Sequence, residues 1–493
     1  MSAPRNDALG GKIRRGLAWS TLSSTMLRLG SLLVGVVLAR LLAPEDFGVY
    51  AIALAVQSVL MTLADLGMSV DLVRAPDPVR RAPTVATVSL VSGIVLALVM
   101  TLTAGPAAAL MGAPNATDVI MVLSWTIVVS AAGVVPYAKL QREFDQRSLF
   151  ICSLVDFAVG TTTTIALVKL GMGPMALAVG RVVAQSAATA LQFFITRVRP
   201  RFGFDRAIAR SALVFGIPLA GANFLSWALL NIDNVVISRV AGLTALGLYV
   251  LAFNISSWPM TVIGQAIRSV SLAGFSHAAQ RDDDRALLTG LGLTWAVALP
   301  VGVLLAALAR PLVVLLYGER WSSSAAVLAA LGFFGALRVV LDLFATYLMA
   351  RGAARPVLYV QILWFVALIP AVAAGAHWMG INGAGWAHVA VATVLILPAY
   401  AVALRRLGVP MSGLVRAMWL PIAASVPTWW LAHTVATQID EPILALALGG
   451  ALGCAAYVAI VYRWAQRLLP DRTQHTEKPS GARVDEPRLE GAT

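Results

Sequence analysis

Charged side chains are scarce in this sequence. Only 12% of its 493 residues are Asp, Glu, Lys or Arg, whereas soluble domains contain about 25%. The only two cysteines, Cys152 and Cys454, lie within apolar runs, which argues against a disulfide framework. The five histidines lack the spacing of metal ligands. We therefore expect neither a metal site nor a cofactor.

Local motifs of several enzyme classes are also missing. The sequence contains no Gly-rich phosphate loop, no nucleophile elbow and no HExxH motif. Its polar start leads into an apolar run too long for the core of a signal peptide, so no cleaved signal is expected. These absences argue against an enzyme.

Apolar residues dominate instead, at 59% of the chain with a mean hydropathy of +0.81. About fourteen apolar segments are long enough to cross a bilayer as helices. The sequence therefore predicts an all-α, polytopic membrane protein. Its segments are roughly 17–42, 47–70, 84–110, 118–138, 149–168, 175–196, 211–241, 244–272, 286–309, 323–350, 356–376, 383–404, 414–436 and 442–464.

The distribution of basic residues predicts the orientation. The net charge is +13, and 28 of the 37 Lys and Arg residues fall in the termini and in alternate loops. Such loops face the cytoplasm, so we expect both termini there. The turns on the other side are short and often acidic, as at Glu45 and Asp46. The positive charge is thus a topology signal, and no nucleic-acid partner is expected.

An internal repeat organises the chain. The stretch 36–53, VVLARLLAPEDFGVYAIA, returns 199 positions later as VVISRVAGLTALGLYVLA at 235–252. Six of the eighteen aligned positions are identical, among them Arg40/Arg239 and Gly48/Gly247. Because this offset spans six helices, an even number, the two copies enter the membrane in the same direction. They form a parallel repeat.

The repeat predicts two six-helix lobes that face each other across a central cavity. We place the N-lobe at 12–200 and the C-lobe at 207–406. The last two helices, within 412–467, stand outside the repeat. The polar tail 468–493 is expected to be disordered and cytoplasmic.

Several arginines fall within predicted spans, where a charge costs several kcal/mol and needs a reason. Arg28 lies near the centre of the first segment, where it either binds an anion in the cavity or has a structural partner. Arg268 is near the inner end of the eighth segment, and snorkelling explains it equally well. Arg338 either binds substrate or neutralises Asp342, four residues later.

Acidic and amide residues in the spans are candidates for ion coupling or substrate binding. Asp65, Asp233 and Asp342 are candidates for ion coupling, although Asp65 is close enough to the inner interface to be only a helix end. Asn223 and Asn234 share one face of the seventh segment. Such a stripe either lines a wet cavity, where it would bind substrate, or bonds to a neighbouring helix.

Three stretches resemble a known family. LARLLAPEDFGVYAIAL (38–54), DLGMSVDLVR (65–74) and NIDNVVISRVAGLTALGLYVLAF (231–253) are similar to bacterial polysaccharide transporters of the MOP flippase superfamily, in the WzxC/TuaB-like branch. The resemblance covers about residues 12–465. It implies a two-lobe fold of fourteen helices with alternating access. In lipid II flippases of the same superfamily, cavity arginines hold the pyrophosphate, which favours Arg28 and Arg268 by helix position.

The expected function is therefore a flippase for an undecaprenyl-pyrophosphate-linked oligosaccharide in the bacterial inner membrane, serving capsule, exopolysaccharide or O-antigen assembly. Membrane lipids are further expected partners, as are a polysaccharide polymerase and export machinery. The alternatives are a lipid II flippase or a drug/cation exporter of the same superfamily. A membrane-embedded polymerase or ligase is disfavoured, because the outer turns are too short to hold catalytic groups.

Overall fold

A computed structural model describes residues 26–27, 30–65, 67–279 and 285–468. The side chains of Thr62, Asp65, 215–230, 266–279 and 467–468 lie outside the description. All regular elements of the described residues are helices, and each of the fourteen predicted segments contains one. Nine helical stretches in this part of the chain are long and apolar enough to cross a membrane. The prediction of an all-α, polytopic membrane protein is confirmed.

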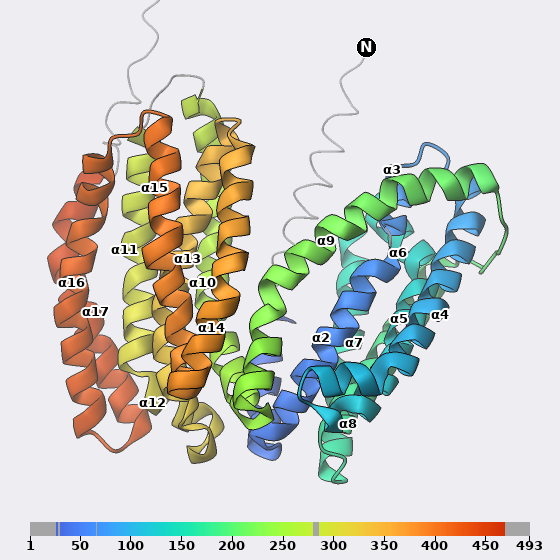
Figure 1. Cartoon of the computed structure of the whole chain (residues 1–493), viewed down its shortest axis with the longest axis horizontal. Coiled ribbons are helices and arrows are strands. Elements are labelled where there is room, and N and C mark those ends of the chain that lie inside the picture. Colours follow the sequence, from blue (N-terminus) through green and yellow to red (C-terminus); the bar gives the residue numbers. More distant parts are fainter. Residues whose placement is uncertain (1–25, 28–29, 66, 280–284, 469–493) are drawn as a thin grey trace, which may run out of the picture.

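The N-lobe is formed by the helices of the first half of the chain (Figure 1). They are the helix Gly30–Leu41, α2 (Pro44–Asp65), α3 (Met68–Arg74), α4 (Pro78–Leu110), η1 (Pro114–Ala116), α5 (Thr117–Ala132), α6 (Val134–Arg142), α7 (Gln146–Lys169) and α8 (Pro174–Thr196). Asp77 and Asp145 begin α4 and α7 by accepting hydrogen bonds from the backbone N–H groups of Arg80 and Ser148.

The C-lobe follows an extended linker at 197–205. Its elements are α9 (Arg206–Ala241), α10 (Leu243–Ala279), α11 (Arg285–Ala307), α12 (Ala309–Tyr317), η2 (Glu319–Trp321), α13 (Ser324–Ala350), α14 (Ala354–Val391), η3 (Ala392–Ile396) and α15 (Leu397–Arg406). Gly380 divides α14 into two helices, since its φ of 60° and ψ of −147° are not helical. Such a conformation favours glycine, which explains the turn there.

Small residues let the C-lobe helices approach closely. Most residues of α13 are buried, so it is the central helix of this lobe. At its contact with α11, Gly302 and Gly332 lie backbone to backbone, because a Cβ on Gly332 would be 2.9 Å from the carbonyl oxygen of Gly302. Helices in lipid are not driven together by the hydrophobic effect, so close van der Waals packing between small residues stabilises their association instead. The last two helices, α16 (Met411–Gln438) and α17 (Pro442–Leu468), pack on α11 at the edge of the molecule (Figure 1).

Helix α9 joins the two lobes. It begins on the N-lobe, where Arg81 bonds both to the carboxylate of Asp71 on α3 and, at 2.8 Å, to the hydroxyl of Ser211 on α9. Ala212 of α9 packs in an apolar cluster with N-lobe residues such as Leu72 and Val85. The other end of α9 packs against α14 of the C-lobe and buries Ile237 in an apolar cluster that continues through both lobes. In Figure 1 it runs diagonally from the end where the lobes diverge to the end where they meet.

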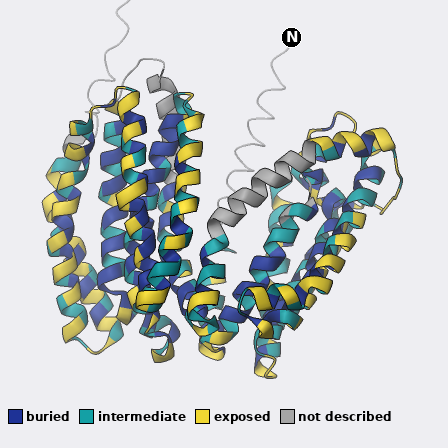
Figure 2. Cartoon of the chain, in the orientation of Figure 1, coloured by how far each residue is buried: buried dark blue, intermediate teal, exposed yellow. Residues whose placement is uncertain are grey.

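The outward faces of both lobes are apolar. Figure 2 shows buried positions along the inner faces of the helices and exposed positions along their outer faces. Large exposed side chains on these outer faces include Leu102 on α4 and Val426 and Trp430 on α16. Exposed apolar faces of this extent are expected where a helix bundle contacts lipid.

Candidate functional site

The two repeat copies pack against each other where the lobes meet. A Cβ on Gly48 would overlap the carbonyl oxygen of Leu243, and a Cβ on Gly247 would overlap that of Pro44. The 199-residue offset relates Gly48 to Gly247 and Pro44 to Leu243. The contact is therefore reciprocal, as expected for an interface with two-fold pseudosymmetry. Only glycine permits the backbones to come this close.

Two arginines at matching repeat positions hold this end together. Arg40, at the end of the helix Gly30–Leu41, donates to the carbonyl oxygens of Leu315 at 2.7 Å and Leu316 at 3.0 Å on α12. Arg239 on α9 donates to the carbonyl oxygen of Ala109 on α4 at 3.2 Å. Each guanidinium thus bonds the C-terminal carbonyls of a helix of the opposite lobe. A cation is stabilised there by the helix dipole.

Further bonds cross the same contact. Trp321 is fully buried and its indole N–H donates to the carbonyl oxygen of Ala39 at 2.8 Å. The Ser238 hydroxyl donates to the carbonyl oxygen of Met111 at 2.8 Å. The Phe47 ring meets the Trp321 ring edge to face, with centroids 5.2 Å apart. We refer to the contact of 39–48 and 109–111 with 238–247 and 315–321 as the closed end.

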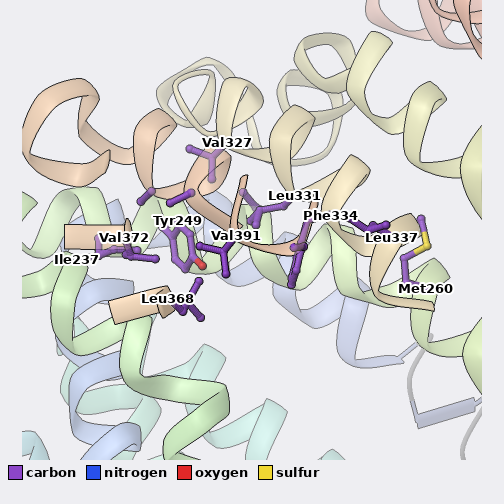
Figure 3. Packing of buried hydrophobic residues seen from close by; sticks show 14 of the residues in the cluster. Ile237, Tyr249, Met260, Val327, Leu331, Phe334, Leu337, Leu368, Val372 and Val391 are labelled. Atoms are coloured by element: carbon purple, nitrogen blue, oxygen red, sulfur yellow. The ribbon is translucent and has the colours of Figure 1, made fainter. Parts of the chain in front are cut away.

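A buried polar cluster lies within the C-lobe. The Tyr249 hydroxyl donates to Oδ2 of Asp233 at 2.7 Å and lies 2.9 Å from Nε2 of His388. Nε2 of His388 is 3.7 Å from the same carboxylate oxygen. All three residues are at most 5% exposed. Ile237, Leu368, Val372 and Val391 lie around the Tyr249 ring (Figure 3).

The hydrogen bonds of this cluster assign the histidine tautomer. Because the Tyr249 hydroxyl donates to Asp233, its oxygen accepts from His388, which places the histidine proton on Nε2. Nδ1 then carries a lone pair, and it has no partner among the described residues. The cluster thus contains two groups that can take up a proton, the carboxylate of Asp233 and Nδ1 of His388. The hydroxyl of Tyr249 connects their side chains. No group of three or more potential metal ligands occurs in the described part of the chain.

Two cavities lined by Arg338 and Asp342 of α13 lead to this cluster. Both residues line a cavity of about 240 Å³ between α10 and α13. Both also line a second cavity of about 100 Å³, which reaches Asp233 and His388. The predicted Arg338–Asp342 pair therefore faces a polar hollow that continues to the buried cluster.

The N-lobe contains a larger hollow of different character. Two adjoining cavities of about 450 and 560 Å³ share Tyr137, Gln185 and Gln192 as lining residues. Arg181 also lines the larger one, and it forms an ion pair with Asp156 at 3.1 Å. Among the described lining residues, uncharged amides and a phenol accompany a single compensated ion pair. This set is suited to bind hydroxyl groups rather than a net charge.

The predicted site residues are distributed as follows. Asp233, Arg338 and Asp342 gather around the C-lobe cavities, and Asn234 adjoins Asp233, to which its backbone N–H donates at 2.9 Å. Arg28 lies outside the described residues. Asp65, Asn223 and Arg268 lie on α2, α9 and α10, but their side chains are outside the description.

Sequence reasoning missed His388, Tyr249 and the N-lobe glutamines. His388 lies 155 residues after Asp233 and belongs to no motif, so nothing in the sequence pairs them. Tyr249 was visible as an identical repeat position, and so were Arg40 and Arg239. Gln185 and Gln192 are seven residues apart, two turns of one helix face, and this spacing was the available signal.

Comparisons with known proteins agree with this architecture. The model of a family described as "Polysaccharide biosynthesis protein" matches residues 37–326. The succinoglycan biosynthesis transport protein ExoT of Rhizobium meliloti (strain 1021) is 27% identical over 487 residues, covering 97% of both chains. The lipopolysaccharide biosynthesis protein WzxC of Escherichia coli (strain K12) is 24% identical over 421 residues, covering 84% of this chain and 85% of its own.

Solved structures share the fold. An inward closed conformation of the lipid II flippase MurJ superposes with a TM-score of 0.73 at 14% identity, covering 92% of this chain and 99% of its own. An inward-facing multidrug resistance transporter of the MATE family, in the MOP superfamily, gives a TM-score of 0.60 at 18% identity. The match covers 80% of this chain and 98% of the transporter. At these identities the similarity concerns the fold.

Proposed function

This chain belongs to the polysaccharide biosynthesis protein family, and from that premise we propose that it is a flippase. Its cargo would be an undecaprenyl-pyrophosphate-linked oligosaccharide, moved across the bacterial inner membrane for capsule, exopolysaccharide or O-antigen assembly. The observation that carries the proposal is the reciprocal contact of Gly48 and Gly247. Two repeat-related lobes that touch at one end and diverge at the other can rock against each other, so that the touching ends separate while the diverging ends come together.

We further propose that both termini are cytoplasmic. The acidic turn at Glu45 and Asp46 then lies on the outer side, and so does the closed end. The lobes diverge at the opposite end (Figure 1), which would then face the cytoplasm. On this orientation the structure is inward-facing, the state that receives a lipid-linked sugar made in the cytoplasm.

The cargo has three parts, and each needs a different environment. For the pyrophosphate we propose Arg338, with Arg28 and Arg268 as the other cations, because guanidinium groups offset the desolvation of phosphate oxygens. Asn223 and Asn234 remain proposed contacts on α9. For the uncharged sugars the polar N-lobe hollow supplies amides and hydroxyls. The isoprenoid tail would stay in lipid.

Coupling to a cation gradient is proposed at the C-lobe cluster. Asp233 is held by Tyr249 and His388, and Asp342 lines the cavity that reaches them. Burial makes a lone charge costly there, so a proton entering the cluster would alter the balance of charge around Arg338. Asp65 is the proposed counterpart in the N-lobe.

A transporter without catalytic activity is the proposal, in keeping with the transport name of the ExoT relative. A polymerase or ligase would need catalytic groups on an outer loop. Within the described residues, the closed end consists of helix ends, the short helices α12 and η2, and turns such as Leu42–Pro44 and Ala241–Leu243 rather than a long loop. A lipid II flippase and a drug/cation exporter have the same fold and are the alternatives. A polysaccharide polymerase and export machinery are the proposed protein partners.

The decisive experiment follows lipid-linked repeat units in cells that lack this protein. We expect export of the glycan to stop and the units to collect on the inner leaflet, shielded from a membrane-impermeant reagent that oxidises sugars. Wild-type protein should restore both export and labelling from outside. Units that accumulate unpolymerised but accessible from outside would instead indicate a polymerase and overturn the proposal.

A further inference from the structure

A second binding site lies at the edge of the N-lobe that is remote from the C-lobe. A cavity of about 640 Å³ is enclosed by the start of α4, by α6, by the end of α8 and by the linker 198–202. Figure 1 shows α4 and this linker at the far side of the N-lobe from the C-lobe. The cavity shares no lining residue with either the C-lobe cavities or the N-lobe hollow. It is therefore separate from the proposed transport path.

The wall of this cavity is built by specific contacts. The backbone N–H groups of Gly203 and Asp205 donate to the hydroxyls of Thr87 and Thr84 on α4, each at 3.1 Å. Thr84 is almost fully buried. A Cβ on Gly203 would be 3.3 Å from Pro83, so the linker lies directly on α4. The space below it is thus fixed by the fold.

The interior is apolar and its mouth is cationic. One face of α4, with Val79, Ala82, Ala86 and Leu90, forms much of the wall, and Phe193 of α8 forms another part. These positions are spaced three to four residues apart and so form a continuous apolar strip. The charged lining residues are four cations and one anion. They are Lys139, Arg142, Arg199, Arg201 and Glu143.

The cations divide into engaged and available groups. The Lys139 ammonium donates to the carbonyl oxygen of Thr196 at 3.0 Å, and Arg142 donates to that of Val73 at 3.1 Å. Arg199 and Arg201 are exposed, and no hydrogen bond or ion pair is found for either within the described residues. Their guanidinium groups can therefore bind an incoming anion.

Exposed aromatic rings stand beside these arginines. Phe202 in the linker is 62% exposed and Phe194 at the end of α8 is 81% exposed. Rings of this kind are unfavourable in water but are favoured at the headgroup level of a bilayer, next to basic residues. The linker thus has the composition of a segment that lies in the membrane interface.

We propose that this cavity binds one anionic phospholipid, with an acyl chain along α4 and the phosphate between Arg199 and Arg201. The apolar strip requires a hydrocarbon chain, which free phosphate lacks. The cationic mouth disfavours zwitterionic lipids relative to phosphatidylglycerol. The position beside lipid-facing helices favours a lipid over a soluble peptide. If the termini are cytoplasmic, as proposed above, the lipid belongs to the cytoplasmic leaflet; the identification of the occupant as a lipid does not depend on that orientation.

The test uses the full chain in detergent, with phosphatidylglycerol and phosphatidylcholine of identical acyl chains. Native mass spectrometry measures the lipid retained on the protein. We expect Arg199→Gln with Arg201→Gln to weaken phosphatidylglycerol retention by about fivefold for each arginine. The matched control is Arg405→Gln with Arg406→Gln, an exposed pair at the end of α15, and it should change nothing. Ala86→Phe, which fills the apolar strip, should weaken both lipids.

Several results would overturn the site. Equal retention of the two lipids by the wild type would remove the role of the arginines. An equal loss of phosphatidylglycerol retention in the Arg405→Gln, Arg406→Gln control would show that the effect comes from the net charge of the protein surface. Full competition by millimolar inorganic phosphate would indicate a free-anion site. Unchanged retention in Ala86→Phe would show that the chain lies elsewhere. None of these outcomes depends on glycan export, so the flippase proposal stands or falls separately.

Discussion

Gly48 and Gly247 each lie against the carbonyl group of the residue four positions before the other, Leu243 and Pro44. The two glycines are 199 residues apart in sequence and equivalent in the repeat. Their contact brings α2 and α10 together at the closed end. Opening of this end must therefore separate equivalent backbone segments of the two lobes.

The first prediction concerns these glycines. Gly48→Ala and Gly247→Ala should each force the backbones apart, because the added Cβ would overlap a carbonyl oxygen. Overpacking of this kind costs about 1–3 kcal/mol, which would favour opening of the closed end by roughly 5- to 150-fold. The measurement is the rate at which a membrane-impermeant maleimide labels Ser238→Cys, with the native cysteines replaced by alanine. Ser238 is 2% exposed at this contact.

Gly105→Ala is the matched control. Gly105 lies on α4, and a Cβ there would meet nothing within 4 Å. Its labelling rate should equal that of the parent protein. Faster labelling in Gly48→Ala but not in Gly247→Ala would contradict the reciprocal character of the contact.

The second prediction concerns the arginines of the closed end. Arg40→Ala removes two cross-lobe hydrogen bonds and Arg239→Ala removes one. We expect both to speed labelling of Ser238→Cys, with the larger effect in Arg40→Ala. The loss is about 1 kcal/mol for each bond, because both side chains are partly solvated. The two effects should add, since the sites share no partner. Arg310→Ala, an exposed residue paired with Glu319 at 3.6 Å, is the control.

The sequence predicted the helices well. A membrane-spanning helix must form all of its backbone hydrogen bonds internally, and it can be recognised in the sequence as a long apolar run. It also identified Arg40, Arg239 and the two glycines as repeated positions. It could not identify what these residues contact. Arg40 bonds backbone carbonyls 275 and 276 residues away, and a carbonyl carries no sequence signature.

The candidate site was predicted only in part for a similar reason. Asp233 and Arg338 stood out because a charge within an apolar span needs a reason. His388 and the N-lobe glutamines gave no such signal, since neutral polar residues occur in membrane helices at lower cost. Arg181 and Asp156 lie in the sixth and fifth predicted segments, and the structure shows that they pair with each other. Pairings between distant helices depend on packing, which the sequence does not display.

The third prediction tests the C-lobe cluster. Asp233→Asn should lower glycan export at least tenfold at matched membrane abundance, because the amide cannot take up a proton. Tyr249→Phe removes one hydrogen bond to a buried carboxylate and should have a smaller effect. Residual export by Asp233→Asn should no longer respond to an ionophore that collapses the proton gradient. The control is Ser425→Ala, a buried hydroxyl bonded within α16. Normal export by Asp233→Asn would exclude the cluster from coupling.

The fourth prediction separates sugar recognition from coupling. Gln185 and Gln192 line both cavities of the N-lobe hollow, and each amide can bond sugar hydroxyls. A hydrogen bond of this kind contributes about 0.5–1.5 kcal/mol, so Gln185→Ala with Gln192→Ala should lower export roughly tenfold. The response to the ionophore should persist, since the C-lobe cluster is intact. Ser186→Ala, a hydroxyl bonded to its own helix at Val182, is the control on α8. If the double variant exports normally, the sugars bind elsewhere. If it exports poorly and also loses the ionophore response, the two lobes do not divide these tasks.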